Sequence, residues 1–336
     1  MTLLSGIAMS AYTDLVRLLR DDAISGAEGT PTLKQRGDKA YWYAARRVGS
    51  GMRFSYIGED SDDTRARIER LEELQATAKE RQAERSRLVR LLRAEGLTPT
   101  DRATGSILSA MADAGTFRLG GTMVGTNAFR LYEGELGIRL PLGGMANTGD
   151  IDIAQFEKLS IALEDQVDPG LAETFSALKF APLPGLGPGR TWRWEQGGSG
   201  QLVEFLTPAF GEETIRDLPA LGVNAQALNY LNFLIAEPIH AAAIYRSGIL
   251  VQVPRPERFA IHKLIVADRR RDGAGSLKSS KDREQAAFLI EALAEDRPDD
   301  LRQAYAAAID VGPRWREHIA GSLKRMPETV QILNAL

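Results

Sequence analysis

The 336-residue chain contains no cysteine. That absence excludes disulfide bonds, thiolate metal sites and cysteine nucleophiles, and it fits a reducing compartment. The three histidines, His240, His262 and His318, are too scattered to predict a zinc site. No window approaches 18 uninterrupted apolar residues, so we expect no membrane-spanning helix. We therefore expect a soluble, cytoplasmic protein whose N-terminal segment is a helix rather than a signal peptide.

The chain also lacks a strong excess of charge of either sign. It has 42 Lys and Arg against 45 Asp and Glu, a net charge of −3, so no global field points to nucleic acid or to a membrane. Residue patterns predict an α+β fold, in which helices flank a mixed sheet. We predict three parts: a helical N-terminal region with a hairpin and a long helix (1–100), a mixed α/β core (101–254), and a helical C-terminal domain (255–336).

Residues 61–95 contain neither proline nor glycine, and Gly96 follows them. The acidic start, the glycine stop and a leucine stripe predict one long, largely solvated helix. Such a helix is either a plain amphipathic element or a surface that pairs with a partner protein or a second copy of the chain.

Two aspartates stand among isoleucines in the stretch "TGDIDIAQFE" (148–157). In a strand, Asp150 and Asp152 share one face while Ile151 and Ile153 face the other way. Acids often occupy strand ends without any function. Two neighbouring carboxylates repel each other, however, and a divalent cation between them relieves that repulsion.

Two further features could complete a site around these aspartates. Gly120 and Gly121 precede Thr122 and a helical pattern, and such a turn either needs positive φ or brings backbone N–H groups to an anion. Glu204, between Val203 and Phe205 in a predicted strand, is either an exposed edge acid or a third carboxylate delivered to the same place.

A basic segment follows between Arg258 and Arg283, with eight Lys and Arg against three Asp. It is either a solvated helix end or a cradle for a polyanion. Lys263 lies among apolar residues, where it either snorkels from a core edge or reaches phosphates. Arg130, on the helix after the glycine turn, is another candidate phosphate contact, with a solvent-facing position as the alternative.

Five stretches together carry a resemblance to a bacterial family of nucleotidyltransferase-fold proteins, within the DNA-polymerase-β-like nucleotidyltransferase superfamily. They are "FRLGGTMVGTNAFRLYEGELGIRLP", "TGDIDIAQFE", "VEFLTP", "FAIHKLIVADRRR" and "KDREQAAFLI". The resemblance covers roughly residues 36–300, and the chain is more distantly similar to the nucleotidyltransferase toxins of abortive-infection toxin–antitoxin pairs. Two departures are an insertion around "PLGGMAN" and a glutamate, Glu204, where aspartate is usual.

The resemblance implies a metal-dependent enzyme that moves a nucleoside monophosphate from an NTP, such as ATP, to a hydroxyl acceptor on tRNA, a protein or a small molecule. It implies Mg²⁺ or Mn²⁺ ligands at Asp150, Asp152 and Glu204, which also act in catalysis. It further implies nucleotide contacts, which are Gly120, Gly121, Thr122, Arg130, Lys263 and, more weakly, Lys281 and Asp282. A toxin or defence role follows by analogy alone. The alternative is a degenerate nucleotide-binding or RNA-binding regulatory module.

Overall fold

The computed structural model describes most of the chain. The described residues are 1–25, 29–36, 39–48, 51–62, 64–66, 68–69, 76–141, 149–162, 166–183, 190–272 and 275–336. The segment 142–147, most of the predicted insertion, lies outside them. Within the described residues, no helix combines the length and the apolar character that crossing a membrane requires.

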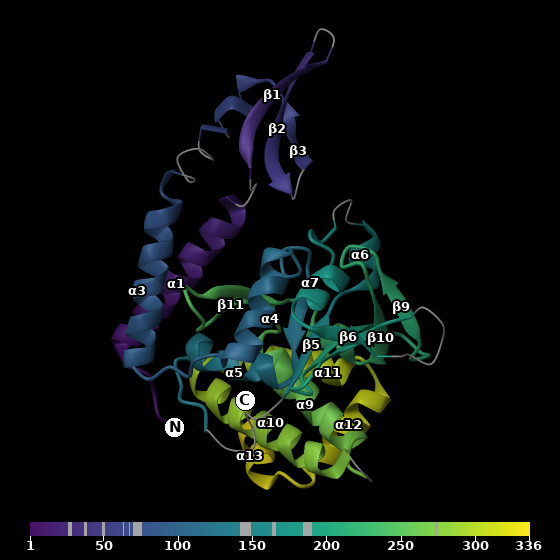
Figure 1. The fold of residues 1–336 in the computed structure, drawn as a ribbon. Helices are drawn as coiled ribbons and strands as arrows, with labels where there is room; N and C mark the ends of the chain where they lie inside the picture. Colours follow the sequence, from purple (N-terminus) through teal and green to yellow (C-terminus); the bar gives the residue numbers. More distant parts are fainter. Residues whose placement is uncertain are drawn as a thin grey trace.

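The N-terminal part combines a helix pair with a small sheet. Helix α1 (Gly6–Ser25) packs against α3 (Ala78–Ala94), and Leu15, Leu19 and Leu92 are buried in a core that they share with Ala242 and Ile244. Beyond the ends of these helices lies a three-stranded antiparallel sheet (Figure 1), formed by β1 (Thr30–Arg36), β2 (Lys39–Val48) and β3 (Gly51–Glu59).

The long helix predicted over 61–95 is interrupted. Thr77 is a turn residue with φ −91° and ψ 0°, and α3 begins only at Ala78. Residues 63, 67 and 70–75 lie outside the described part of the chain. In the second half of the segment the predicted leucine stripe is buried against α1 at Leu88 and Leu92, together with Val89, and the rest of α3 is exposed or half-buried.

A mixed sheet forms the centre of the molecule, with the order β4–β5–β8–β10–β9. Strand β7 pairs with the first half of β8, and β6 pairs with β7. Strands β5 and β8 are parallel, whereas β4 is antiparallel to β5. This sheet and its helices confirm the predicted α+β class. The strands are β4 (Thr122–Val124), β5 (Asp150–Ala154), β6 (Phe180–Pro182), β7 (Arg193–Gln196), β8 (Leu202–Ala209), β9 (Ile215–Leu218) and β10 (Val223–Asn229).

One face of β5 and of the first half of β8 is apolar and buried. Ile151, Ile153, Val203 and Phe205 have no exposed surface, and the ring of Phe205 lies 6.1 Å from that of Phe175 in α7. This burial fixes the strand register, because a slip by one residue would bring the acids of β5 into the core. The helices of this region are α4 (Arg102–Asp113), α5 (Gly125–Leu136), α6 (Glu157–Ala162), α7 (Leu171–Ala177) and α8 (Leu231–Leu234).

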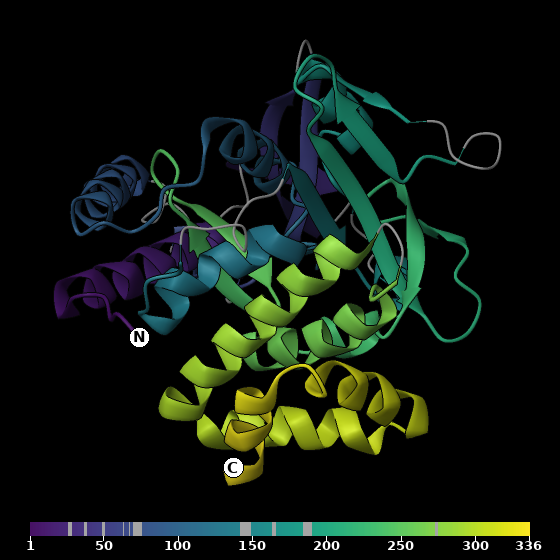
Figure 2. The ribbon, with the colours of Figure 1, turned by 90° about the horizontal axis from the view of Figure 1, so that it is seen from below.

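The C-terminal part is helical and joins the core through a two-stranded sheet of β11 (Ile239–Ala243) and β12 (Ile249–Val253). Helices α9 and α10 pack closely together, and the later helices cover them from outside (Figure 2). Helix α10 starts at Ser276, within the basic segment. The helices are α9 (Pro256–Arg269), α10 (Ser276–Asp296), α11 (Pro298–Asp310), α12 (Pro313–Leu323) and α13 (Pro327–Ala335).

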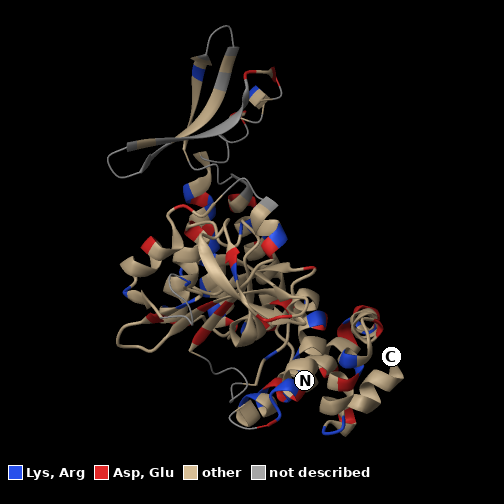
Figure 3. Ribbon diagram, turned by 90° about the vertical axis from the view of Figure 1, so that its right-hand side faces the viewer, with Lys and Arg blue, Asp and Glu red and all other residues tan. Residues whose placement is uncertain are grey.

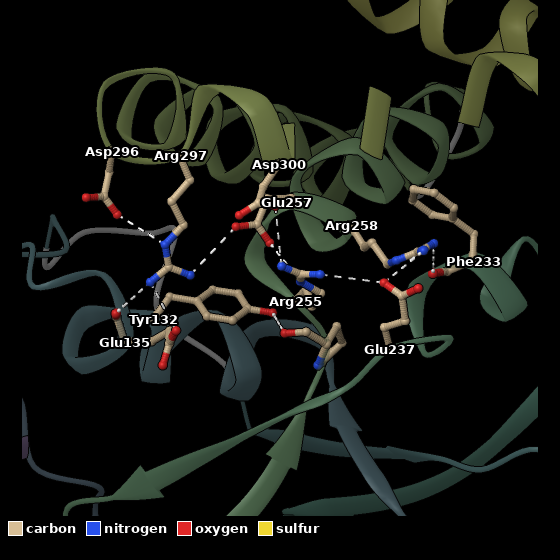
Figure 4. Close-up of polar contacts among 11 residues, drawn as sticks. Tyr132, Glu135, Phe233, Glu237, Arg255, Glu257, Arg258, Asp296, Arg297 and Asp300 are labelled. Carbon is tan, nitrogen blue, oxygen red and sulfur yellow. Dashed lines mark hydrogen bonds and ion pairs between the residues drawn. The ribbon is translucent and has the colours of Figure 1, made fainter. Parts of the chain in front are cut away.

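A buried ionic cluster ties α9 to its neighbours (Figure 4). Glu257, in the first turn of α9, is 2% exposed and lies 3.7 Å from both Arg255 and Arg297. Arg297 also contacts Glu135 of α5 at 3.1 Å. Burial raises the pKa of Glu257. Elsewhere acidic and basic residues are interspersed along the ribbon (Figure 3), in keeping with the small net charge.

Candidate active site

Three acidic residues lie on the polar face of β5 and β8. Asp150 and Asp152 are the first and third residues of β5, and Asp152 is the direct register partner of Glu204 on β8. Register partners on neighbouring strands have backbones about 5 Å apart. The structure therefore brings Glu204 beside the aspartates, as the alternation of the two strands predicts. Neither the Asp152 nor the Glu204 carboxylate forms a hydrogen bond or an ion pair with any residue that the structure describes.

A glycine at the start of α5 closes one side of this acidic face. Gly125 has φ +69°, and a Cβ placed on it would collide with Oδ2 of Asp152. The Asp152 carboxylate thus lies against the first residue of a 12-residue helix, where the helix dipole favours negative charge. Asn127, two residues further, donates a hydrogen bond of 2.6 Å from Nδ2 to the carbonyl oxygen of Asp150. Asn127 therefore fixes the start of β5 relative to α5.

The glycine pair predicted to face the acids lies at the opposite end of β4. Thr122 pairs with Ala154 and Val124 pairs with Asp152, so Gly120 and Gly121 adjoin the far end of β5. A Cβ on Gly121 would meet the carbonyl oxygen of Thr116 at 2.7 Å, so this glycine serves a tight turn. The helix after the turn begins at Gly125, not directly after Gly121. Gly125, a further glycine at the start of the helical pattern, was the sequence signal that pointed to this turn and was missed.

Crowding of negative charge shifts the proton affinity of these acids. Burial, followed by the charges of Glu204 and Asp150, raises the pKa of Asp152 to about 7, against the lowering effect of Lys263 and Arg270. Burial and the charge of Asp150 likewise raise the pKa of Glu204. The folded chain therefore holds these carboxylates at a cost that a nearby cation would reduce.

Cationic side chains from α9 and α10 face the acids. Lys263, 7% exposed, contacts Oδ1 of Asp282 at 2.5 Å, and Arg270 contacts Oδ2 of the same carboxylate at 3.0 Å. Burial and the neighbouring charge of Lys263 lower the pKa of Lys281, which also experiences the field of Asp150. Asp282 lies in the second turn of α10 and is 3% exposed. It orients two cations beside the acidic face.

A family model described as a nucleotidyltransferase matches residues 102–310. The chain belongs to this nucleotidyltransferase family. The matched range includes the whole of β5, β8, α9 and α10, which carry the acids and the cations described above. Residues 12–67, which include most of α1 and all of β1–β3, match a second model, described as a domain of unknown function. The domain boundaries predicted after residues 100 and 254 stay predictions.

Comparison with individual proteins adds little to the family assignment. No curated protein matches the chain. A crystal structure of an antigenic nucleotidyltransferase-like protein from Paracoccidioides brasiliensis is similar over 67% of this chain and 95% of its own, with 14% identity and a TM-score of 0.34. A similarity of this size supports no statement about the site.

Two predicted nucleotide contacts of this nucleotidyltransferase have other partners in the structure. Arg130 lies 3.7 Å from Asp101, the N-cap residue of α4. The hydroxyl of Thr122 accepts a hydrogen bond of 2.8 Å from Gln252 of β12, and Thr122 is 1% exposed. Both side chains are thus used to join elements of the core.

The carboxylates present oxygen donors, but they do not form a closed cage. No group of three or more His, Cys, Asp or Glu residues is arranged to hold a metal ion anywhere in the described ranges. A pair of carboxylates still suits Mg²⁺, which usually takes one or two carboxylates and completes its shell with water and substrate phosphates. The half-buried Asp152, without a hydrogen-bond partner among the described residues, fits such an open site.

Proposed function

We propose that the protein is a metal-dependent nucleotidyltransferase, which moves a nucleoside monophosphate from an NTP to a hydroxyl acceptor and releases pyrophosphate. One observation carries the proposal: the register of β5 and β8 sets Asp152 beside Glu204, with the helix start at Gly125 adjoining Asp152. Family membership supports nucleotidyl transfer in general. The metal, the nucleotide and the acceptor are our inference.

Asp150 and Asp152 would hold Mg²⁺ or Mn²⁺. When bound, the ion would neutralise charge on the triphosphate, and it would offset both the burial and the carboxylate repulsion that raise the pKa of Asp152. Only two carboxylates need to contribute, because the phosphate oxygens of the nucleotide supply further ligands. This division leaves Glu204 available for another role.

The triphosphate would lie between the start of α5 and the cations of α9 and α10. Backbone N–H groups at Gly125 and Thr126 are the first donors of α5, and a helix N-terminus favours phosphate. Lys263 and Lys281 supply positive charge from the other side, and the field of Lys263 reaches Asp152. This arrangement replaces Gly120 and Gly121 by Gly125 as the phosphate turn.

Glu204 would act as the general base for the acceptor. Burial and the charge of Asp150 raise the pKa of Glu204, which makes it a stronger base than an ordinary glutamate. The acceptor oxygen attacks the α-phosphorus, the bond from that phosphorus to the bridging oxygen of pyrophosphate breaks, and the hydroxyl proton passes to Glu204. The bound geometry supplies most of the rate gain, because the reacting oxygen and phosphorus are held together.

Transfer of label tests the proposal. Purified protein, Mg²⁺ and each α-³²P-labelled NTP are incubated with cell extract, and label is followed in RNA, protein and small molecules. We expect transfer by the wild type, and a loss of at least about 100-fold in the Asp152→Asn and Glu204→Gln variants. Glu195→Gln is the matched control, because Glu195 is an exposed acid on β7. This variant should transfer label as the wild type does.

Three results would be informative in different ways. Transfer that survives Asp152→Asn would contradict the assignment of this residue. NTP binding without transfer to any fraction would favour the degenerate nucleotide-binding module. Salt-sensitive RNA binding with no NTP binding would favour the RNA-binding module.

A further inference from the structure

An arginine stands on the opposite side of Glu204 from the aspartates. Arg193, the first residue of β7, is the direct register partner of Glu204. Partners in a strand pair share a face, so Asp152, Glu204 and Arg193 form a row across three adjacent strands. At about 5 Å per strand, the Arg193 backbone lies about 10 Å from that of Asp152. The nucleotide end of this row is at Gly125, and Arg193 marks the other end.

The guanidinium of Arg193 has donors to spare. Arg193 is half-buried, and its guanidinium forms no hydrogen bond or ion pair with any residue in the described ranges, although its charge acts on the neighbouring Glu204 and lowers the pKa of that carboxyl. It stacks on the half-exposed ring of Trp192, with Cζ 4.6 Å from the ring centroid. Stacking engages the flat face of a guanidinium and leaves the N–H groups at its rim available to an oxyanion.

Nearby arginines differ from Arg193 in this respect. Arg190, three residues earlier, donates to the carbonyl oxygen of Ile215 at 3.2 Å, and Arg216 contacts Glu157 at 2.8 Å. The Arg193 charge is balanced in part by the nearby Glu204 carboxylate, but its N–H donors lack a hydrogen-bond acceptor among the described residues, and burying unsatisfied donors costs free energy. Beside a reactive centre, that cost is recovered when a ligand brings an anion.

We propose that Arg193 and Trp192 form the acceptor subsite, which takes a nucleotide unit of a polynucleotide acceptor beside Glu204. The proposal rests on the proposed function for its reaction. Arg193 binds a phosphate of the acceptor, and Trp192 stacks on the adjoining base. A phosphate next to a planar ring matches an arginine next to an indole, and neither an aliphatic hydroxyl nor a serine side chain offers both groups. Glu204 is then the carboxylate nearest the acceptor hydroxyl.

Binding of unfractionated transfer RNA, with no NTP present, tests the subsite apart from the chemistry. We expect Arg193→Ala and Trp192→Ala each to weaken binding at least about fivefold, in line with the loss of one stacked base or one phosphate contact. Arg193→Lys should recover part of the affinity, because charge is kept but the planar fork is lost. Arg190→Ala is the matched control and should bind within about twofold of wild type.

A spectroscopic signal separates direct contact from a structural effect. RNA should quench part of the tryptophan fluorescence of the wild type, and that part should be missing in Trp192→Phe, which keeps an aromatic ring for stacking. Unchanged RNA affinity in Arg193→Ala, or equal quenching in Trp192→Phe, would overturn the subsite.

Transfer assays distinguish failure of the subsite from failure of the reaction. With label transferred to RNA, Arg193→Ala should raise the KM for RNA about tenfold and leave the affinity for Mg²⁺–NTP unchanged. Label that appears in protein alone, or an unchanged KM in Arg193→Ala, overturns the subsite while the nucleotidyltransferase stands. RNA binding that depends on Arg193 without any label transfer supports the subsite and contradicts the proposed reaction.

Discussion

Replacing Asp152 with asparagine should stabilise the metal-free protein while it abolishes transfer. Asparagine has nearly the same shape, so packing against Gly125 is kept. The change removes a charge that burial, Glu204 and Asp150 all oppose. A substitution that increases stability and destroys activity is the signature of a charge kept for function rather than for folding.

The magnitude follows from the pKa of Asp152. In the folded chain it is about 7, against an ordinary value of 3.8, a difference of roughly three pKa units. At about 1.4 kcal/mol per unit, the ionised carboxylate costs at most about 4 kcal/mol. Because Asp152 is only half-buried, water screens part of this cost. We therefore expect Asp152→Asn to gain about 1–3 kcal/mol in unfolding free energy at pH 8.

The gain should depend on pH with a definite sign. Well below the unfolded pKa of 3.8 the carboxyl is protonated in both states, and wild type and Asp152→Asn should be equally stable. Between pH 4 and 7 the unfolded chain releases the proton of Asp152 while the folded chain retains it, so wild-type stability falls as pH rises. The difference should be complete near pH 8. Urea unfolding in EDTA at pH 4.5 and 8 measures it.

A control and a refutation complete this prediction. Glu195→Gln removes the charge of Glu195, the exposed residue of β7. It should change the unfolding free energy by less than about 0.5 kcal/mol at either pH. If Asp152→Asn is no more stable than the wild type at pH 8, the acids do not repel each other as inferred, and the argument for a cation between them fails.

Two further substitutions test the turn and the cations. Gly125→Ala and Gly222→Ala both force alanine into positive φ, at +69° and +63°. Each variant should lose about 1–2 kcal/mol of unfolding free energy. Only Gly125→Ala, whose Cβ meets the Asp152 carboxylate, should also lose NTP binding measured by calorimetry. Equal NTP affinity in the two variants would exclude Gly125 from the site. Lys263→Met leaves the buried Asp282 without its 2.5 Å partner, and it should lower the unfolding free energy measured in urea by about 3–5 kcal/mol. The double variant Lys263→Met/Asp282→Leu should regain most of that stability but should not regain NTP affinity. Recovery of NTP affinity in the double variant would show that Lys263 has only a structural role.

The acidic face could be predicted because it depends on local alternation. Asp150 and Asp152 are separated from Ile151 and Ile153 by the two-residue period of a strand, and that period is visible in the sequence. The same holds for Glu204 among apolar neighbours. That Glu204 lies exactly opposite Asp152 required the parallel pairing of β5 with β8, which no local pattern encodes.

The nucleotide side was harder to predict, because its parts depend on distant contacts. Phe117 and Leu119 alternate with Arg118 as strand residues do, yet they are buried within a turn that packs on the core. The glycine turn at the helix start was therefore expected at Gly120 and Gly121, one element before Gly125. Arg130 looked available on its helix, and only the packing of α4 beside α5 reveals Asp101 as its partner. Lys263 was expected near phosphate, but its contact with Asp282 joins two helices.

Calorimetric titration with non-hydrolysable NTP analogues, with Mg²⁺ and then with EDTA, tests the central claim most directly. The account predicts that at least one analogue binds the wild type with Mg²⁺, and that EDTA or Asp150→Asn/Asp152→Asn weakens this binding at least about tenfold. Equal affinity with EDTA, or equal affinity in the double variant, would contradict a metal–nucleotide site on the acidic face of β5.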